Sequence, residues 1–196
     1  SDAAKKPQTV ALTGASGLIG SALSAALRAR GDQVLHLVRR APQSEGLADG
    51  VREAQWNPKE GELDPALLEG VDAIVHLAGA GIGDHRWTSS YKKAIRSSRV
   101  SGTEAVSTAI AGLNAPMRLV SGSAVGYYGN RGSDVLTEES RLGEGFLARV
   151  CRDWEAATWR ATSAGASVAL ARTGIVLSPR GGAMAKMMPL AKFGLA

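Results

Sequence analysis

The fold of this chain is decided by the stretch Thr13-Gly14-Ala15-Ser16-Gly17-Leu18-Ile19-Gly20. It follows the apolar run Val10-Ala11-Leu12 and opens a helical pattern of apolar residues. A strand, a glycine-rich turn and a helix in this order form the context of a dinucleotide-binding loop. A glycine turn with a structural role alone is the alternative.

Each glycine of the turn has a separate expected role. Gly14 lets the chain leave the strand sharply, and Gly17 removes a side chain where a pyrophosphate approaches the backbone. Gly20 lets the helix pack close to the strand. Ser16 either caps the helix or bonds a phosphate oxygen. The N–H groups at the start of the helix attract phosphate, so we expect the cofactor to contact Gly14, Ser16, Gly17, Leu18, Ile19 and Gly20.

Strands and helices alternate along the chain. This order predicts parallel strands joined by right-handed crossovers, hence an α/β fold of the Rossmann type with a doubly wound parallel sheet. The expected strands are 9–13, 34–38, 51–56, 71–78, 117–121 and 167–173. The expected helices are 18–30, a short helix that begins at Asp64-Pro65, a long helix from Thr88 or Ser89 to Ala111, and 146–163.

The chain divides into three expected parts: an N-terminal tail (1–8), an NAD(P)-binding Rossmann domain (9–178) and the start of an incomplete C-terminal substrate lobe (179–196). The 196 residues suffice for one hydrophobic core. Tail residues Ser1 to Pro7 lack the apolar segment of a signal peptide. No apolar run is long enough for a membrane span, and a single cysteine, Cys151, fits a reducing cytoplasm.

Charge and histidine spacing exclude two classes of ligand. The net charge of +5 comes without an arginine-rich stripe with interleaved aromatic residues, so nucleic acid is not the expected partner. The three histidines lack metal-ligand spacing, and no metal is expected. A small-molecule substrate remains. Lys92, Lys93, Arg96 and Arg99 on the long helix are mainly expected to form a solvated face.

The end of the second strand indicates which cofactor is bound. NAD enzymes usually carry a carboxylate about 20 residues after the glycines, which binds the ribose hydroxyl. This chain reads Leu37-Val38-Arg39-Arg40 there, without a carboxylate. Two guanidinium groups suit the 2′-phosphate of NADP. We therefore expect Arg39 and Arg40 to select NADP over NAD, an exposed basic loop being the alternative.

An ordered set of motifs resembles one protein family. Taken together, the motifs are similar to an atypical branch of the extended short-chain dehydrogenases/reductases, the epimerase-family proteins described as sugar-nucleotide epimerase-like or SulA-related. The motifs are Gly14-x-x-Gly17-x-x-Gly20, His76-Leu77-Ala78-Gly79, Arg86-Trp87-Thr88, Ser98-Arg99-Val100-x-Gly102-Thr103, Ser121-Gly122-Ser123-Ala124-Val125-Gly126-Tyr127-Tyr128-Gly129, Cys151-x-x-Trp154-Glu155 and Arg172-Thr173-Gly174-Ile175-Val176-Leu177.

This resemblance implies a Rossmann sheet that carries NADP or NAD and a small C-terminal substrate lobe. It places Gly79 and Ala80, after Leu77 and Ala78, beside the adenosine or pyrophosphate. Ser121, Gly122 and Ser123 would lie at the nicotinamide end of the fifth strand. Related folds often form homodimers through two long helices, here 89–111 and 146–163.

The chain departs from this family in its catalytic residues. Extended members carry a Tyr-x-x-x-Lys pair on the helix after the fifth strand, whereas this chain has Phe146-x-x-x-Val150 and Leu147-x-x-x-Cys151. Candidate substitutes are Ser123, Tyr127 and Tyr128. One tyrosine packing in the core and the other on the nicotinamide is the alternative. Ser123 either polarises a carbonyl or caps the loop.

Several further residues have expected structural roles. Cys151 is expected to be a small buried hydrophobe, and Trp154 and Trp159 to be core or interface anchors. The His76 ring is expected to satisfy a backbone group rather than carry a proton. Arg172 interrupts an apolar strand and requires a counter-charge, for which Glu155 is the expected partner.

Two functions remain open from the sequence. The first is an NADP(H)-binding epimerase or oxidoreductase-like enzyme that transfers hydride on a hydroxyl or keto group of a small polar substrate, which includes nucleotide-sugar-like compounds. The second is a catalytically weak regulatory or interaction protein that senses NADP(H). Its basis is the missing Tyr-x-x-x-Lys pair.

Overall fold

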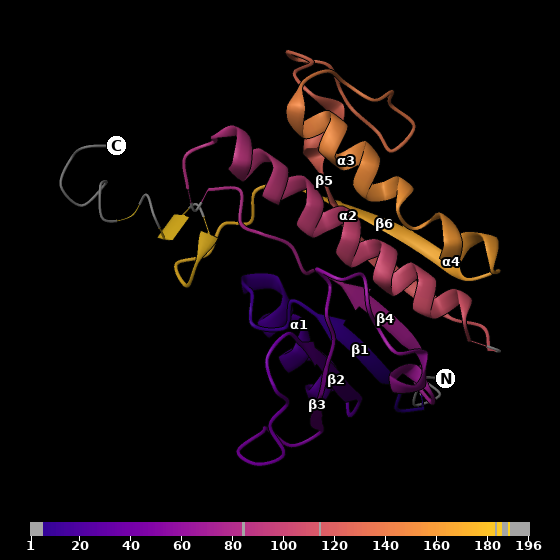
Figure 1. Ribbon diagram of the computed structural model, residues 1–196. Helices are drawn as coiled ribbons and strands as arrows, with labels where there is room; N and C mark the ends of the chain where they lie inside the picture. The colour runs from indigo at the N-terminus through magenta and orange to yellow at the C-terminus, as the bar shows by residue number, and fades with distance from the viewer. Residues whose placement is uncertain (1–5, 84, 114, 183, 186–187, 189–196) are drawn as a thin grey trace, which may run out of the picture.

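The protein folds around a parallel sheet of six strands in the order β3-β2-β1-β4-β5-β6 (Figure 1). The computed structural model describes residues 6–83, 85–113, 115–182, 184–185 and 188. The strands are β1 (Thr9–Thr13), β2 (Gln33–Val38), β3 (Val51–Gln55), β4 (Ala73–His76), β5 (Arg118–Ala124) and β6 (Ser167–Thr173). All neighbouring pairs are parallel, which confirms the expected α/β class.

Helices cover both faces of the sheet. They are α1 (Leu18–Ala29), η1 (Pro65–Leu68), α2 (Ser89–Ala111), η2 (Val125–Tyr128), α3 (Phe146–Ala156) and α4 (Trp159–Ser163). In Figure 1, α2, α3 and α4 lie together over the half of the sheet that holds β4, β5 and β6. Helix α1 packs against β1 and β2.

Alternating side chains of β1 show that α1 and α2 pack on opposite faces of the sheet. Val10 and Leu12 pack in a cluster with Leu27 of α1. Ala11, between them, packs in the larger cluster that contains Val106 and Ile110 of α2. Successive side chains of a strand point to opposite faces, so the central strand is buried by helices on both sides.

The predicted helix 146–163 is wrong in one respect, because it is broken into α3 and α4. At the break, the Thr158 hydroxyl donates to the Glu155 carbonyl oxygen at 2.8 Å, and the Thr158 N–H donates to the same oxygen at 3.2 Å. Local hydroxyl-to-backbone bonds of this kind compete with helical continuity.

Several strand boundaries also differ from the prediction. β4 spans Ala73–His76 rather than 71–78, and after His76 the N–H groups of Leu77 and Ala78 turn to the Thr13 hydroxyl. β5 spans Arg118–Ala124 rather than 117–121, and both tyrosines lie on η2 directly after it. The other strand ends agree with the prediction to within one residue.

The ends of the chain are only partly described. Residues 1–5 of the expected tail and most of the expected segment 179–196 lie outside the described residues. Within the described part, no helix combines the length and the apolar character that crossing a membrane requires.

Candidate functional site

The glycine turn connects β1 to α1 and packs against the backbone that follows the carboxyl end of β4. Gly14 has φ +70°, and a Cβ at this position would lie 2.9 Å from the carbonyl carbon of Leu77. A Cβ on Gly20 would lie 2.1 Å from the Gly14 oxygen. Both positions therefore require glycine, Gly14 for the turn beside β4 and Gly20 for the close approach of helix and turn.

The remaining residues of the turn are open to solvent. Ser16 and Gly17 are exposed, and Gly17 rather than Ser16 is the N-cap of α1, without a side-chain capping bond. The capping role of Ser16 is therefore not observed. The N–H groups of the first helical turn have no helical acceptors. They adjoin this exposed turn, where an anion can approach.

A buried hydroxyl and imidazole chain supports the loop after β4. His76 is fully buried, with its Nδ1 2.7 Å from Thr13 Oγ1 and its Nε2 3.0 Å from Thr103 Oγ1. Thr13 Oγ1 accepts the N–H groups of Leu77 and Ala78, so its own proton goes to Nδ1, and Nε2–H donates to Thr103. Burial lowers the pKa of His76 to about 4. The ring is neutral, but it bonds two hydroxyls rather than the expected backbone group.

Three side chains hold the loop that follows: Ser98 and Tyr91 of α2, and Trp87, which precedes that helix. The Ala80 N–H donates to Ser98 Oγ at 3.1 Å, the Tyr91 hydroxyl donates to the Gly81 oxygen, and the Trp87 indole N–H donates to the Ile82 oxygen at 2.7 Å. Leu77, Ala78, Gly79 and Ala80 thus lie at the same edge of the sheet as the glycine turn. The structure brings these two predicted cofactor segments together.

Arg39 and Arg40, at the end of β2, differ in their surroundings. Arg40 forms two hydrogen bonds of 2.7 Å with the Glu53 carboxylate of β3, which also accepts the Gln43 N–H. The Arg40 guanidinium holds the pKa of Glu53 below its usual range. Arg39 is exposed; its carbonyl oxygen accepts from the Gln55 amide at 3.2 Å, but its guanidinium has no hydrogen bond or ion pair with the described residues. The sequence alone did not reveal the role of Glu53.

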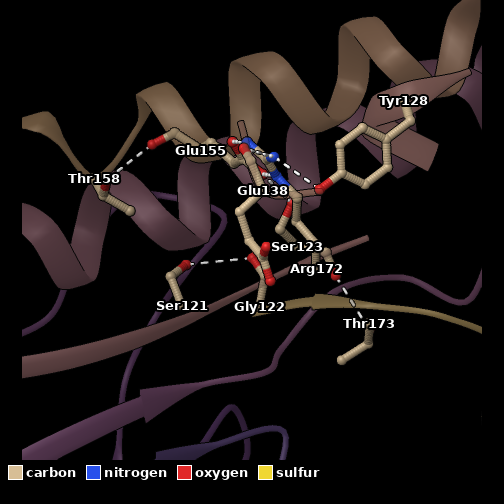
Figure 2. A network of polar contacts seen from close by, with 9 residues as sticks. All are labelled: Ser121, Gly122, Ser123, Tyr128, Glu138, Glu155, Thr158, Arg172 and Thr173. Carbon is tan, nitrogen blue, oxygen red and sulfur yellow. Dashed lines mark hydrogen bonds and ion pairs between the residues drawn. The ribbon is translucent and has the colours of Figure 1, made fainter. Parts of the chain in front are cut away.

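Two of the three candidate catalytic residues, Ser123 and Tyr128, belong to one polar network (Figure 2). The Ser123 hydroxyl donates to Glu155 Oε1 at 2.6 Å. Arg172 binds the same carboxylate through Nε and Nη2, at 2.8 and 2.9 Å. Its Nη1 donates to the Tyr128 hydroxyl at 3.1 Å and to the Glu138 carbonyl at 3.2 Å. The guanidinium carbon also lies 3.5 Å from the centre of the Tyr127 ring.

This geometry confirms the expected Arg172–Glu155 pair. It also distinguishes the surroundings of Ser123, Tyr127 and Tyr128. The hydrogen bonds to Glu155 raise the pKa of Arg172, which stays charged. The Ser123 proton is committed to Glu155. Tyr128 accepts from Arg172, while its own O–H has no acceptor among the described residues. Only 7% of Tyr128 is exposed, whereas Tyr127 is half-buried.

The place of the missing Tyr-x-x-x-Lys pair holds apolar residues. Phe146 packs edge-on against Trp87, and Val150 is buried. Cys151 is buried as expected, and burial raises the pKa of its thiol. Trp154 is also buried as expected, but Trp159 is 56% exposed and is not a core residue.

Ser121 and Gly122 lie inside the protein on β5. Ser121 is fully buried and pairs in register with His76. A Cβ on Gly122 would lie 3.1 Å from the Trp154 ring. The tryptophan therefore fills the space that the glycine leaves.

A hollow lies at the opposite end of the sheet. It is lined by residues of 65–72, 112–113 and 115–118 together with Gly165 and Ser167, at the amino end of the strands. Ligands of open parallel sheets bind at the carboxyl ends, where the strand order reverses. Within the described residues no cluster of histidine, cysteine and carboxylate side chains could hold a metal ion.

The strand order and the glycine turn beside β4 define a Rossmann-type dinucleotide-binding fold. Residues 10–192 match the model of the NAD dependent epimerase/dehydratase family. The chain belongs to this family.

Similar proteins agree with this assignment. An epimerase family protein of Mycobacterium bovis is 50% identical over 186 residues, which are 95% of this chain and 60% of the relative. A nucleoside-diphosphate sugar epimerase of Corynebacterium glutamicum is 44% identical (TM-score 0.81; 95% of this chain, 38% of that chain). The human epimerase family protein SDR39U1, solved with NADPH, is 29% identical (TM-score 0.80; 96% of this chain, 61% of that chain). The chain thus spans about 60% of the curated M. bovis relative.

Proposed function

We propose that this protein binds NADP(H) and transfers hydride on a hydroxyl or keto group of a small polar substrate. The observation that carries the proposal is the contact of the glycine turn with the loop after β4, at the point where the strand order reverses and where Ser16 and Gly17 are exposed. The human relative solved with NADPH supports the cofactor. The C. glutamicum protein, named as a nucleoside-diphosphate sugar epimerase, supports a nucleotide-sugar-like substrate.

Different residues at the carboxyl ends of the strands would bind different parts of the cofactor. The turn from Gly14 to Gly20 would hold the pyrophosphate, and Leu77 to Ala80 would lie beside the adenosine or pyrophosphate. Ser121 and Gly122 would support the nicotinamide end. Arg39 would bind the 2′-phosphate, because it is the basic residue of the pair that is not paired with Glu53.

The polar network would orient the reacting oxygen. NADP(H), when bound, supplies or accepts hydride. The Tyr128 O–H has no acceptor in the part of the chain that the structure describes and is the better placed proton donor, while Tyr127 borders it. Ser123 supports Glu155 through its hydrogen bond and retains lone pairs that can accept a substrate hydroxyl.

The test is a fluorescence titration with NADPH and NADH at fixed salt, on the wild type and on Arg39→Ala and Arg40→Ala separately. We expect NADPH to bind at least about tenfold more tightly, and Arg39→Ala to lose about 1.4 kcal/mol of that preference. Arg40→Ala should change the preference less, since its guanidinium is bound to Glu53. Equal affinities in the wild type would contradict NADP selection, and no binding of either nucleotide would contradict cofactor binding.

A second candidate function is sensing of NADP(H) with weak or no catalysis. It is favoured by Phe146 and Val150 in place of the reactive pair, and by a Ser123 proton already committed to Glu155. Tyr127→Phe/Tyr128→Phe distinguishes the two. Loss of turnover in this variant supports the enzyme. A wild type that turns over no substrate, but whose binding to another protein depends on NADPH, supports the sensor.

A further inference from the structure

Arg99 of α2 is a half-buried cation that lacks a carboxylate partner within the described residues. Its Nη1 donates to the Ile95 carbonyl at 3.0 Å, and its guanidinium carbon lies 5.1 Å from the centre of the Trp154 ring. The expectation that Arg99 belongs to a solvated helix face is therefore wrong. The side chain instead lies between α2 and α3.

These contacts do not compensate the charge. A guanidinium has five N–H donors and stays charged in proteins, and a single carbonyl and an aromatic face leave most of these donors without an acceptor from the described residues. Burial lowers the pKa of Arg99, which reflects the loss of hydration. Arg172, in comparison, directs its donors to two carboxylate oxygens, a phenol and a carbonyl.

Arg99 lies at the candidate site, against the loop after β4. A Cβ on Gly79 would lie 3.3 Å from Arg99 Cγ and 3.6 Å from its Nη1, so the loop after β4 passes directly over this side chain. The Trp154 ring beneath the guanidinium is the ring that Gly122 of β5 accommodates. Arg99 thus lies between the ends of β4 and β5.

A second polar group at the same place is also unsatisfied. The Nε1 atom of Trp154 is buried and has no hydrogen-bond partner among the residues that the structure describes. Buried polar groups are nearly always paired in native proteins. The Arg99 guanidinium, which stacks on the Trp154 ring, and the indole N–H of that ring both lack acceptors. Together they indicate that a ligand supplies a hydrogen-bond acceptor here.

We propose that Arg99 binds an oxyanion, a carboxylate or phosphate group, of a small-molecule ligand at the ends of β4 and β5. The forked donors of arginine match the paired oxygens of both groups. The oxyanion has two possible sources, a phosphate of the cofactor or an acidic group of the substrate. Its assignment to a substrate rests on the proposed function, whereas the oxyanion site itself does not.

Nitrogen-detected or proton–nitrogen NMR of the Arg99 Nε–H group tests the proposal directly. Arg99→Lys identifies the signal by its disappearance, and Trp154→Phe identifies the indole signal. The probes are inorganic phosphate, malonate and NADPH, each titrated into the full chain. We expect phosphate or malonate to shift the Arg99 signal, and Arg99→Met to weaken that anion's affinity about tenfold or more. Lys93→Ala, which removes one charge from the exposed face of the same helix, should leave it unchanged.

The source of the oxyanion follows from adding NADPH first. If saturating NADPH shifts the Arg99 signal and abolishes the response to phosphate and malonate, the cofactor supplies the oxyanion. If the response persists with NADPH bound, the site belongs to an acidic substrate. If NADPH does not bind but phosphate or malonate still shifts the signal, the proposed function fails and the oxyanion site stands. An Arg99 signal that none of the three probes moves overturns the proposal.

Discussion

At the scale of single residues, Glu155 holds together the network beside β5. It accepts hydrogen bonds from Ser123 and from two nitrogens of Arg172, and both charged side chains are mostly buried. Removing one member of a buried ion pair leaves the other charge without compensation, which costs more than removing both. Losing one member of the pair should therefore destabilise the protein more than losing both members.

Glu155→Ala should accordingly lower the free energy of unfolding by about 3 kcal/mol. Glu155→Leu/Arg172→Met, which removes both charges, should cost less than the sum of its single variants. Urea unfolding of the wild type, Glu155→Leu, Arg172→Met and the double variant measures the coupling. Additive effects of the two substitutions would show that the pair is not energetically coupled.

His76 should make stability depend on pH. Its pKa is lowered from 6.5 to about 4 because the ring is buried. As the pH falls below 6.5, the unfolded chain binds a proton that the folded ring does not. Stability is therefore present above pH 6.5 and is lost as the pH falls toward 4, by about 3 kcal/mol in total.

Chemical denaturation at a series of pH values measures this effect. His76→Gln should be less stable at neutral pH, since the bonds to Thr13 and Thr103 change, but its stability should fall less between pH 6.5 and about 4. Parallel pH profiles for wild type and variant would show that His76 is not responsible.

At the scale of elements, different glycines of the turn between β1 and α1 serve packing and ligand binding. Gly20 has backbone atoms where a side chain would be, whereas a Cβ on Gly17 would meet only the Gly14 oxygen, at 3.3 Å. One glycine is thus needed for packing. The other leaves space on the exposed side of the turn.

Gly20→Ala should lower the free energy of unfolding by about 2 kcal/mol, because the added Cβ would push the helix away from the backbone of Gly14 and Ala15 in the turn. Gly17→Ala should cost no more than about 1 kcal/mol, yet weaken NADPH binding about tenfold. Gly174→Ala, with nothing within 4 Å of its Cβ, is the control. Thermal unfolding and the fluorescence titration measure the two effects, and unchanged NADPH affinity in Gly17→Ala would contradict a phosphate at this turn.

The same elements show what the sequence could and could not predict. The strand and helix order was predictable because each element carries its own apolar period and its own turn residues. The Arg172–Glu155 pair was predictable because a charge in an apolar strand requires a partner. The distinction between Arg39 and Arg40 was not, since Glu53 becomes a neighbour only when β3 pairs with β2. The break at Thr158 was missed because it depends on a local hydroxyl bond.

At the scale of the whole molecule, helices α2, α3 and α4 form one layer beside the sheet (Figure 1). We propose that a homodimer forms through residues 89–111 and 146–163. The large exposed side chain of Trp159 supports this proposal, since exposed aromatic residues commonly anchor interfaces.

Sedimentation velocity over a range of concentrations should show a dimer for the wild type. Trp159→Ser should weaken the dimer about tenfold or more, with an unchanged circular dichroism spectrum. Val135→Ser, at a residue that is 91% exposed outside these helices, should have no effect. A monomer at every concentration, or an unaffected dimer in Trp159→Ser, would rule out this interface.

The strand order also determines how the sheet can grow while the chain is synthesised. β2 pairs with β1 and β3 with β2, and β4 then joins the opposite edge of β1. β5 and β6 extend that edge in turn. Every strand that leaves the ribosome therefore meets an existing free edge and never has to insert between strands already paired. Sheet assembly can keep pace with translation, and the edges open to aggregation, once β4 has joined, are β3 on one side and the latest strand added on the other.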